Sequence, residues 1–169
     1  LHITNAKIFK KYIASRSTSL NELLKDSDIL IVNSTLTFLI ESLTICGKGV
    51  HLPDLYPQLL DLINDPKHSL SGKAQTCLEM LCNDIEEVFP YLKSNQYQAV
   101  ALSFLSKYLM QDELDNSIIE HYSELISLLK ARIQDKDVTI RRQSIMLYAK
   151  IASILGSNSQ KLFSELNPL

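Results

Sequence analysis

One pattern recurs along this chain and restricts its fold more than any other feature. Its clearest copy runs from Asp135 to Gly156, and its apolar or small positions are Ile140, Ser144, Leu147, Ile151 and Ile154/Leu155. Intervals of three and four residues place such positions on one face of an amphipathic helix. Asp135 or Asp137 can cap the start of this helix, and Gly156 can end it. The copy therefore predicts a helix with its own start and stop signals.

Three earlier segments follow the same template. Their stripes are Ile31, Thr35, Phe38 and Ser42 after Asp26-Ser27-Asp28; Leu70, Ala74, Cys77 and Leu81 after Asp65; and Tyr97, Ala101, Phe104 and Tyr108 after Lys93. Gly47 closes the first of these segments. The anchor positions 31, 70, 97 and 140 are 39, 27 and 43 residues apart. Such spacings fit two-helix repeats whose loops vary in length.

A second apolar helix is expected before each stripe. The candidate segments are 20–24, 52–63, 85–92 and 118–133. Pro53 suits the start of a helix, whereas Pro57 and Pro90 bend or begin one. A helical hairpin cannot bury its apolar faces alone, so neighbouring hairpins must stack. The sequence predicts an all-α fold of four stacked helical hairpins in a single domain over residues 1–169, with a leading helix at 7–13 and a closing helix at 158–166.

Equivalent positions in the four copies identify the expected core. The core residues predicted in this way are Ile31, Phe38, Leu70, Cys77, Phe104, Leu147 and Ile151. The aromatic stripe of the third copy, at 97, 104 and 108, is assigned to the same core rather than to a binding face.

The composition agrees with a helical protein and disfavours several functional classes. Only 4 Gly and 5 Pro occur in 169 residues, so tight turns are few. A formal net charge of −2 disfavours nucleic-acid binding. Residues 29–45 form the most apolar run, but polar residues interrupt it, and we expect no membrane span. The first residue is Leu1 and no signal-peptide pattern follows it, so we expect a part of a longer protein.

The residue types used in catalysis or metal binding are scattered. Cys46, Cys77 and Cys82 lack CxxC spacing and lie in apolar contexts, which indicates buried thiols in a reducing compartment. The four histidines are His2, His51, His68 and His121. None of them has a partner at metal-ligand spacing. Gly47-Lys48-Gly49 lacks the frame of a phosphate-binding loop. We therefore expect no enzyme activity, no cofactor, no metal and no small-molecule substrate.

The repeat resembles a known family of helical arrays. From Asp135 to Leu147 the pattern Asp-x-Asp-x-x-Ile-Arg-x-x-Ser-x-x-Leu resembles the HEAT-repeat consensus. The stretches 25–36, 62–70 and 135–168 are more specifically similar to TOG domains, the tubulin-binding HEAT arrays of microtubule polymerases and the CLASP family. This resemblance covers most of the chain. It implies tubulin as the protein partner and a cytoplasmic location on the cytoskeleton, at microtubules, the spindle or a kinetochore.

Two features depart from that family. The chain contains no Trp, whereas many TOG domains carry one in the first inter-helix loop, and the first repeat is incomplete. Both departures concern the first contact point of the tubulin-binding edge.

The resemblance also implies a set of partner-binding residues, because the loops within TOG hairpins line the edge that meets tubulin. The corresponding positions here are Lys25, Lys67, Lys93, Lys136, Arg141 and Arg142. A basic residue at each repeat edge can attract an acidic partner, although a lysine in such a loop is ordinarily just solvated. Arg141 has a second interpretation, an internal bond to an Asp of a neighbouring loop. Arg142 lies about 100° further around the helix and is expected to be more exposed.

Two other functions remain open at this point. The first is a general HEAT scaffold or transport-receptor fragment, which would bind a peptide or helix through exposed aromatic or acidic residues on its inner helices. The second is an α-helical regulatory domain attached to an enzyme, for which the sequence contains no supporting motif.

Overall fold

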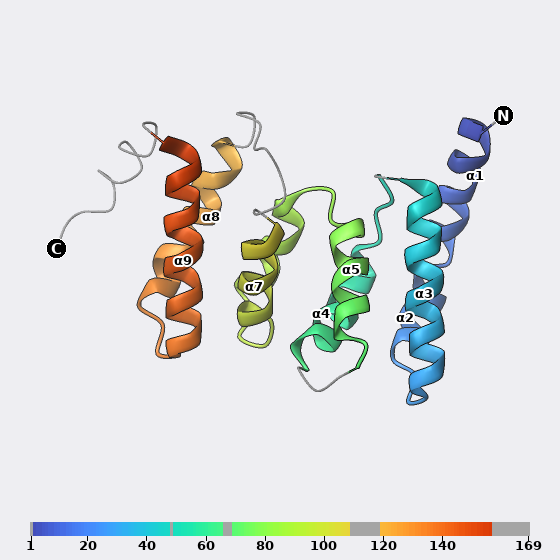
Figure 1. The fold of residues 1–169 in the computed structure, drawn as a ribbon, viewed down its shortest axis with the longest axis horizontal. Helices are drawn as coiled ribbons and strands as arrows, with labels where there is room; N and C mark the ends of the chain where they lie inside the picture. The colour runs from blue at the N-terminus through green and yellow to red at the C-terminus, as the bar shows by residue number, and fades with distance from the viewer. Residues whose placement is uncertain (1, 48, 66–68, 109–118, 157–169) are drawn as a thin grey trace. The chain divides into compact units, whose positions relative to one another are not determined.

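The computed structural model describes residues 2–47, 49–65, 69–108 and 119–156 of this protein (Figure 1). Helices account for 81% of these residues, and none of them lies in a strand. The prediction of an all-α fold is therefore confirmed. The chain forms two compact units, an N-terminal unit, Leu1–Val88, and a C-terminal unit, Phe89–Leu169.

Two helical hairpins and a leading helix make up most of the N-terminal unit. Its elements are α1 (His2–Ser15), α2 (Ser17–Leu24), α3 (Ile29–Cys46), the 3-10 turn η1 (Pro53–Leu55), α4 (Tyr56–Asn64), α5 (Ser71–Leu81) and the 3-10 turn η2 (Ile85–Val88). Helix α2 packs against α3, and α4 packs against α5, as the predicted hairpins require. Helix α3 also contacts α1 and α5, so it is the central helix of this unit.

The C-terminal unit contains the last two predicted hairpins, except for η2, the first part of the third hairpin, which belongs to the N-terminal unit. Its described elements are α6 (Phe89–Leu92), α7 (Gln98–Tyr108), α8 (Ile119–Ile133) and α9 (Val138–Leu155). Helix α6 packs against α7, and α8 packs against α9. Helix α9 also packs against α7, so the second helices of the two hairpins lie side by side (Figure 1). The closing helix predicted at 158–166 falls outside the described residues.

The same local chemistry starts and ends the two longest helices. Asp28 caps α3 by accepting a hydrogen bond from the Leu30 N–H at 2.8 Å, and Asp137 caps α9 through the Thr139 N–H at 2.7 Å. Glycines with positive φ follow both helices, Gly47 at 66° and Gly156 at 51°. A glycine suits this left-handed backbone because it has no Cβ to clash. The predicted start and stop signals of both helices are thus confirmed.

Most of the predicted core is buried. Leu70 and Cys77 are 7% and 0% exposed in the N-terminal unit, and Phe104, Leu147 and Ile151 are 2%, 1% and 1% exposed in the C-terminal unit. In the third stripe, Tyr97 and Tyr108 are half-buried on either side of Phe104, whose ring stacks on that of Tyr108 at 5.8 Å.

Two predicted core residues are not buried. Ile31 is 37% exposed and Phe38 is 41% exposed. The buried face of α3 consists instead of Val32, Thr35, Leu36, Leu39, Ser42, Leu43 and Cys46. Helix α3 carries apolar residues on more than one face, so its own pattern fits two registers. The register that is buried is set by packing against α1, α2 and α5.

Helix α3 is also apolar enough to meet a membrane-span criterion. Among the described residues, the helix Ile29–Cys46 is long and apolar enough to cross a membrane by length and composition alone. Its mean hydropathy is 1.8, and 39% of it is buried inside the protein. This differs from the expectation, because the polar residues that interrupt the run are hydroxyls and amides, and Glu41 is its only charge. A core helix meets the same criterion without crossing a membrane.

Candidate functional site

The loop between α2 and α3 holds the first of the predicted basic residues. Lys25 caps the C-terminus of α2, and its ammonium lies 3.5 Å from Glu22 Oε1. The next residues form an Asp-x-Asp turn, in which Asp26 Oδ1 accepts the Asp28 N–H at 2.8 Å. The turn fixes the backbone beside Lys25, while the Lys25 side chain stays 42% exposed. Lys67, from the next hairpin, lies outside the described residues.

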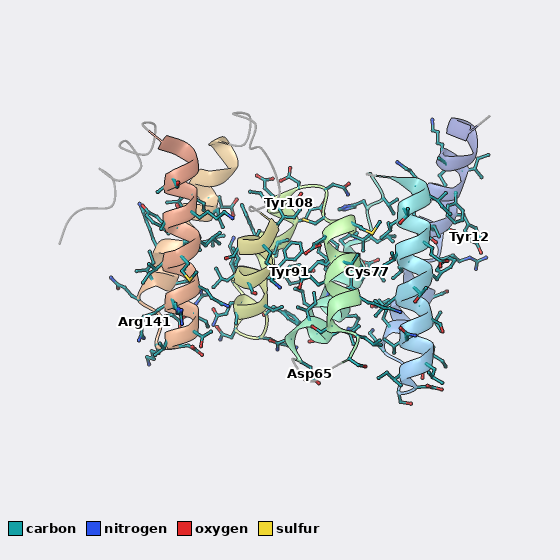
Figure 2. The ribbon with its side chains drawn as sticks, viewed as in Figure 1. Tyr12, Asp65, Cys77, Tyr91, Tyr108 and Arg141 are labelled. Atoms are coloured by element: carbon teal, nitrogen blue, oxygen red, sulfur yellow. The ribbon has the colours of Figure 1, made fainter. Side chains whose placement is uncertain are left out.

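The loop between α8 and α9 repeats this turn. Asp135 Oδ1 accepts the Asp137 N–H at 3.0 Å, as Asp26 does for Asp28. Arg141, labelled in Figure 2, reinforces the loop. Its Nη1 donates to the carbonyl oxygens of Asp135 at 2.7 Å and Lys136 at 3.0 Å. The expected internal role of Arg141 is therefore present in a different form: it bonds two backbone carbonyls of its own loop rather than a carboxylate of a neighbouring one.

The remaining basic residues point outward. Lys136 sits at the centre of the Asp-x-Asp turn and is exposed. Arg142 is exposed as well, whereas Arg141 is half-buried. Lys93 follows α6, and its Nζ lies 3.4 Å from Glu124 Oε1 of α8. Both partners of that ion pair are more than half exposed, at 60% and 53%. An exposed pair of this kind contributes about 1 kcal/mol or less to stability.

Arg132 joins the two basic loops of the C-terminal unit, a role that the sequence analysis did not predict. Its Nη2 donates to the carbonyl oxygen of Leu92 at 3.2 Å, next to Lys93. Its Nη1 lies 3.4 Å from Asp135 Oδ2, in the loop that carries Lys136. The Arg132 side chain is 25% exposed and the Asp135 side chain 17% exposed, so this link is better shielded than the Lys93 pair. The loops of the third and fourth hairpins are thus fastened together.

The N-terminal unit contains a polar cluster of titratable and amide side chains. The Tyr56 hydroxyl donates to a carboxylate oxygen of Glu87, and His51 Nδ1 lies 3.3 Å from the other oxygen. Asn83 ties the same region together by accepting from the Gly49 N–H at 2.8 Å and donating to the Val50 carbonyl at 3.0 Å. These contacts hold the segment between α3 and η1 against the start of η2.

The three cysteines are buried free thiols, as predicted. Burial raises the pKa of Cys77 to about 12. It also raises the pKa of Cys82 to about 12, with added repulsion from Glu87 and Asp84. A thiol reacts as its thiolate, so both groups are unreactive at neutral pH. Among the described residues, no group of three or more His, Cys, Asp and Glu side chains could hold a metal ion.

An apolar groove on the N-terminal unit was not expected from the sequence. It lies between α2 and the first half of α3, and its lining includes the exposed side chains of Ile31 and Phe38. These residues were assigned to the core, and their exposure leaves an apolar surface open to solvent.

Comparison with known proteins adds no relative: no family model, no curated protein and no solved structure matches this chain.

Proposed function

We propose that this chain is a non-catalytic, TOG-like HEAT array that binds tubulin in the cytoplasm, on microtubules, through the loops between its paired helices. The observation that carries the proposal is the link made by Arg132. Because this side chain bonds the loops on which Lys93 and Lys136 stand, two basic residues from different hairpins share one edge of the C-terminal unit. Stacking of all four hairpins in one row would extend that edge to Lys25 and Lys67.

Electrostatic attraction between the lysines and an acidic surface of tubulin supplies the affinity of this edge. Lys136 is exposed, and Lys93 has only an exposed ion pair to give up when an acidic surface approaches. Each exposed lysine contributes about 1 kcal/mol or less on its own. Several in one row add to the affinity and accelerate association with an acidic partner, in a way that salt screens.

The test is tubulin binding by a charge-reversed edge. Lys93→Glu with Lys136→Glu should weaken tubulin binding roughly tenfold at low salt, with a smaller difference at moderate salt. The thermal melt should be nearly unchanged, because both side chains are exposed. Lys7→Glu with Lys11→Glu is the matched control, since it makes the same charge change at two exposed positions of α1. Gel filtration with tubulin or co-sedimentation measures the affinity.

Arg141→Glu should affect both folding and binding, unlike the double lysine variant. Its guanidinium holds two loop carbonyls, so its loss should lower both the melting temperature and the affinity. Equal affinity of the double lysine variant and the parent would remove the edge from the proposal. No measurable tubulin binding by the parent chain would remove tubulin as the partner.

One observation favours a second candidate function, the general scaffold that binds a peptide or helix. That function requires exposed aromatic or acidic residues on the inner helices. Helix α3, the second helix of its hairpin, carries both Phe38, 41% exposed, and Glu41, which is also exposed. A scaffold of this kind would bind its partner on the helices, and charge reversal of the loop edge would leave the binding intact.

A further inference from the structure

The groove on the N-terminal unit has a volume of about 460 Å³. Its lining residues are Leu20, Leu23, Leu30, Ile31, Ser34, Thr35 and Phe38. Leu20 and Thr35 are 5% and 6% exposed and form the floor, whereas Leu23 and Phe38 at the sides are 42% and 41% exposed. The Thr35 hydroxyl already donates to the Ile31 carbonyl at 2.8 Å, so the floor requires no polar partner. The groove therefore suits an apolar occupant.

The structure of α9 indicates which kind of element fills such a groove. Helices α3 and α9 each have 18 residues and each follows an Asp-x-Asp turn, so every residue of α3 has a counterpart 109 positions later. The counterparts of Ile31 and Phe38 are Ile140 and Leu147, which are 5% and 1% exposed. They are buried because α9 packs against two helices, its hairpin partner α8 and the preceding helix α7.

Among the described helices, α3 has one of these two neighbours beside its first half. Its hairpin partner α2 is present and corresponds to α8. Helix α1 also contacts α3, but Lys10 of α1 lies near Gly49, just beyond the C-terminal end of α3. The C-terminal part of α3 is thus covered, and the groove occupies the place that a counterpart of α7 would take. An α-helix is the element whose side chains fit this place.

The charge around the groove restricts that helix further. Residues 17–46, which supply all of the lining, contain four acidic residues and one basic residue, a formal charge of −3. The basic residue, Lys25, is already paired with Glu22 at 3.5 Å. The carboxylates of Asp26 and Asp28 lie in the loop at one end of the groove, and Glu41 follows Phe38 by one turn of α3. Positive charge beside an apolar stripe complements this surface.

We propose that the groove between α2 and α3 binds an amphipathic α-helix of another protein, whose apolar stripe packs on Leu20, Ile31 and Phe38 and whose flanks carry Lys or Arg. The apolar contact supplies most of the binding, since exposed apolar area is removed from water on both sides. The acidic rim selects the partner and accelerates its association. The lining of this groove lies on α2 and α3 rather than in the loops proposed for tubulin, although its acidic rim shares the α2–α3 loop with Lys25. The two proposals do not depend on each other.

A synthetic helix tests the proposal on the full chain. The probe is a fluorescein-labelled peptide of about 20 residues with Leu at i, i+3, i+4 and i+7 and Lys on both flanks. Its twin carries Glu in place of every Lys. Fluorescence anisotropy should show that the Lys peptide binds and that the Glu peptide binds at least roughly tenfold more weakly at low salt. Glu41→Gln with Asp26→Asn should reduce this difference while preserving the hydrogen-bonding oxygen of residue 26.

Two substitutions locate the binding surface. Phe38→Ser should weaken the Lys peptide at least roughly tenfold, since an exposed aromatic anchor is lost. Ile145→Ser is the matched control, because Ile145 is 50% exposed on α9 and does not belong to the groove lining; it should change the affinity less than about twofold. Circular dichroism confirms that both variants fold. Equal effects of the two substitutions, or equal binding of the two peptides, would overturn the proposal. A chain that dimerises, and becomes monomeric on Phe38→Ser, would also overturn it, because a second copy would then occupy the groove.

Discussion

Helices α3 and α9 follow one plan in the two compact units, yet they bury different faces. On α3, Leu36 is fully buried. The thiol of Cys77, which Figure 2 labels on α5, lies 3.6 Å from the Leu36 carbonyl oxygen. The counterpart of Leu36 on α9 is Ile145, which is 50% exposed. Helix α3 has a following helix, α5, and α9 has a preceding helix, α7. Different neighbouring helices thus accompany different buried stripes on the two helices.

The largest effect is expected when the side chains at equivalent positions of α9 and α3 are truncated to alanine. Leu147→Ala should lower the free energy of unfolding by about 2–5 kcal/mol, because it opens a cavity where α9 packs against α7 and α8. Phe38→Ala, its counterpart on α3, should cost about 1 kcal/mol or less, since the ring is 41% exposed and leaves no closed cavity. Urea unfolding followed by circular dichroism measures both. Similar costs would show that the groove is closed in solution.

The sequence predicted α9 better than α3 for a physical reason. In α9, residues 145–149 are consecutive apolar residues, but Arg141, Arg142 and Lys150 interrupt the stripes beside the one at 140, 147 and 151, so that stripe is the most apolar. In α3, Ile29, Leu30, Ile31 and Val32 are consecutive, so more than one stripe is apolar. The stripe that starts at Val32 continues with three leucines, whereas the template stripe contains Thr35 and Ser42. A repeat template aligned on α9 therefore selected the stripe at 31 and 38, and packing against α5 selected the other one.

The candidate sites show the same division. The Asp-x-Asp turns could be predicted, because capping is a local interaction between a side chain and the next backbone N–H groups. The hydrogen bond from Arg132 to the Leu92 carbonyl joins positions 40 residues apart, and neither segment has a local sequence pattern that predicts it. The groove could not be predicted either, since it depends on which helices lie beside α3.

A second test uses pH, because all three cysteines belong to the N-terminal unit. Burial raises the pKa of Cys77 from 9.0 to about 12. The folded state therefore holds this proton more tightly than the unfolded state does. The resulting stability is fully present below pH 9 and is lost between pH 9 and pH 12, at about 1.4 kcal/mol per pH unit. The N-terminal unit should lose stability over this range more steeply than the C-terminal unit.

Cys77→Ala is the control for this effect. The variant starts from a lower stability at pH 8, but its loss between pH 9 and pH 11 should be shallower than that of the parent, because one buried proton no longer titrates. Cys82, whose pKa is raised to about 12 as well, remains and contributes the rest. Urea unfolding at a series of pH values gives the slope for each protein. Identical slopes would show that the thiol at position 77 is not desolvated in the folded chain.

The smallest expected effect separates two buried hydroxyls at equivalent positions. Thr35 and Ser144 each stand seven residues after the capping Asp of their helix, and they are 6% and 0% exposed. The Thr35 hydroxyl donates to the Ile31 carbonyl at 2.8 Å, whereas Ser144 Oγ makes no hydrogen bond with any described residue. Burying a hydroxyl without a partner costs about 1–3 kcal/mol.

Ser144→Ala removes that cost together with a small volume, so the melting temperature should stay constant or rise. Thr35→Val keeps the shape but removes a bonded hydroxyl, and it should destabilise the chain by about 1 kcal/mol. If Ser144→Ala destabilises as much as Thr35→Val, the hydroxyl on α9 has a hydrogen-bond partner in solution, and the two helices use this position alike.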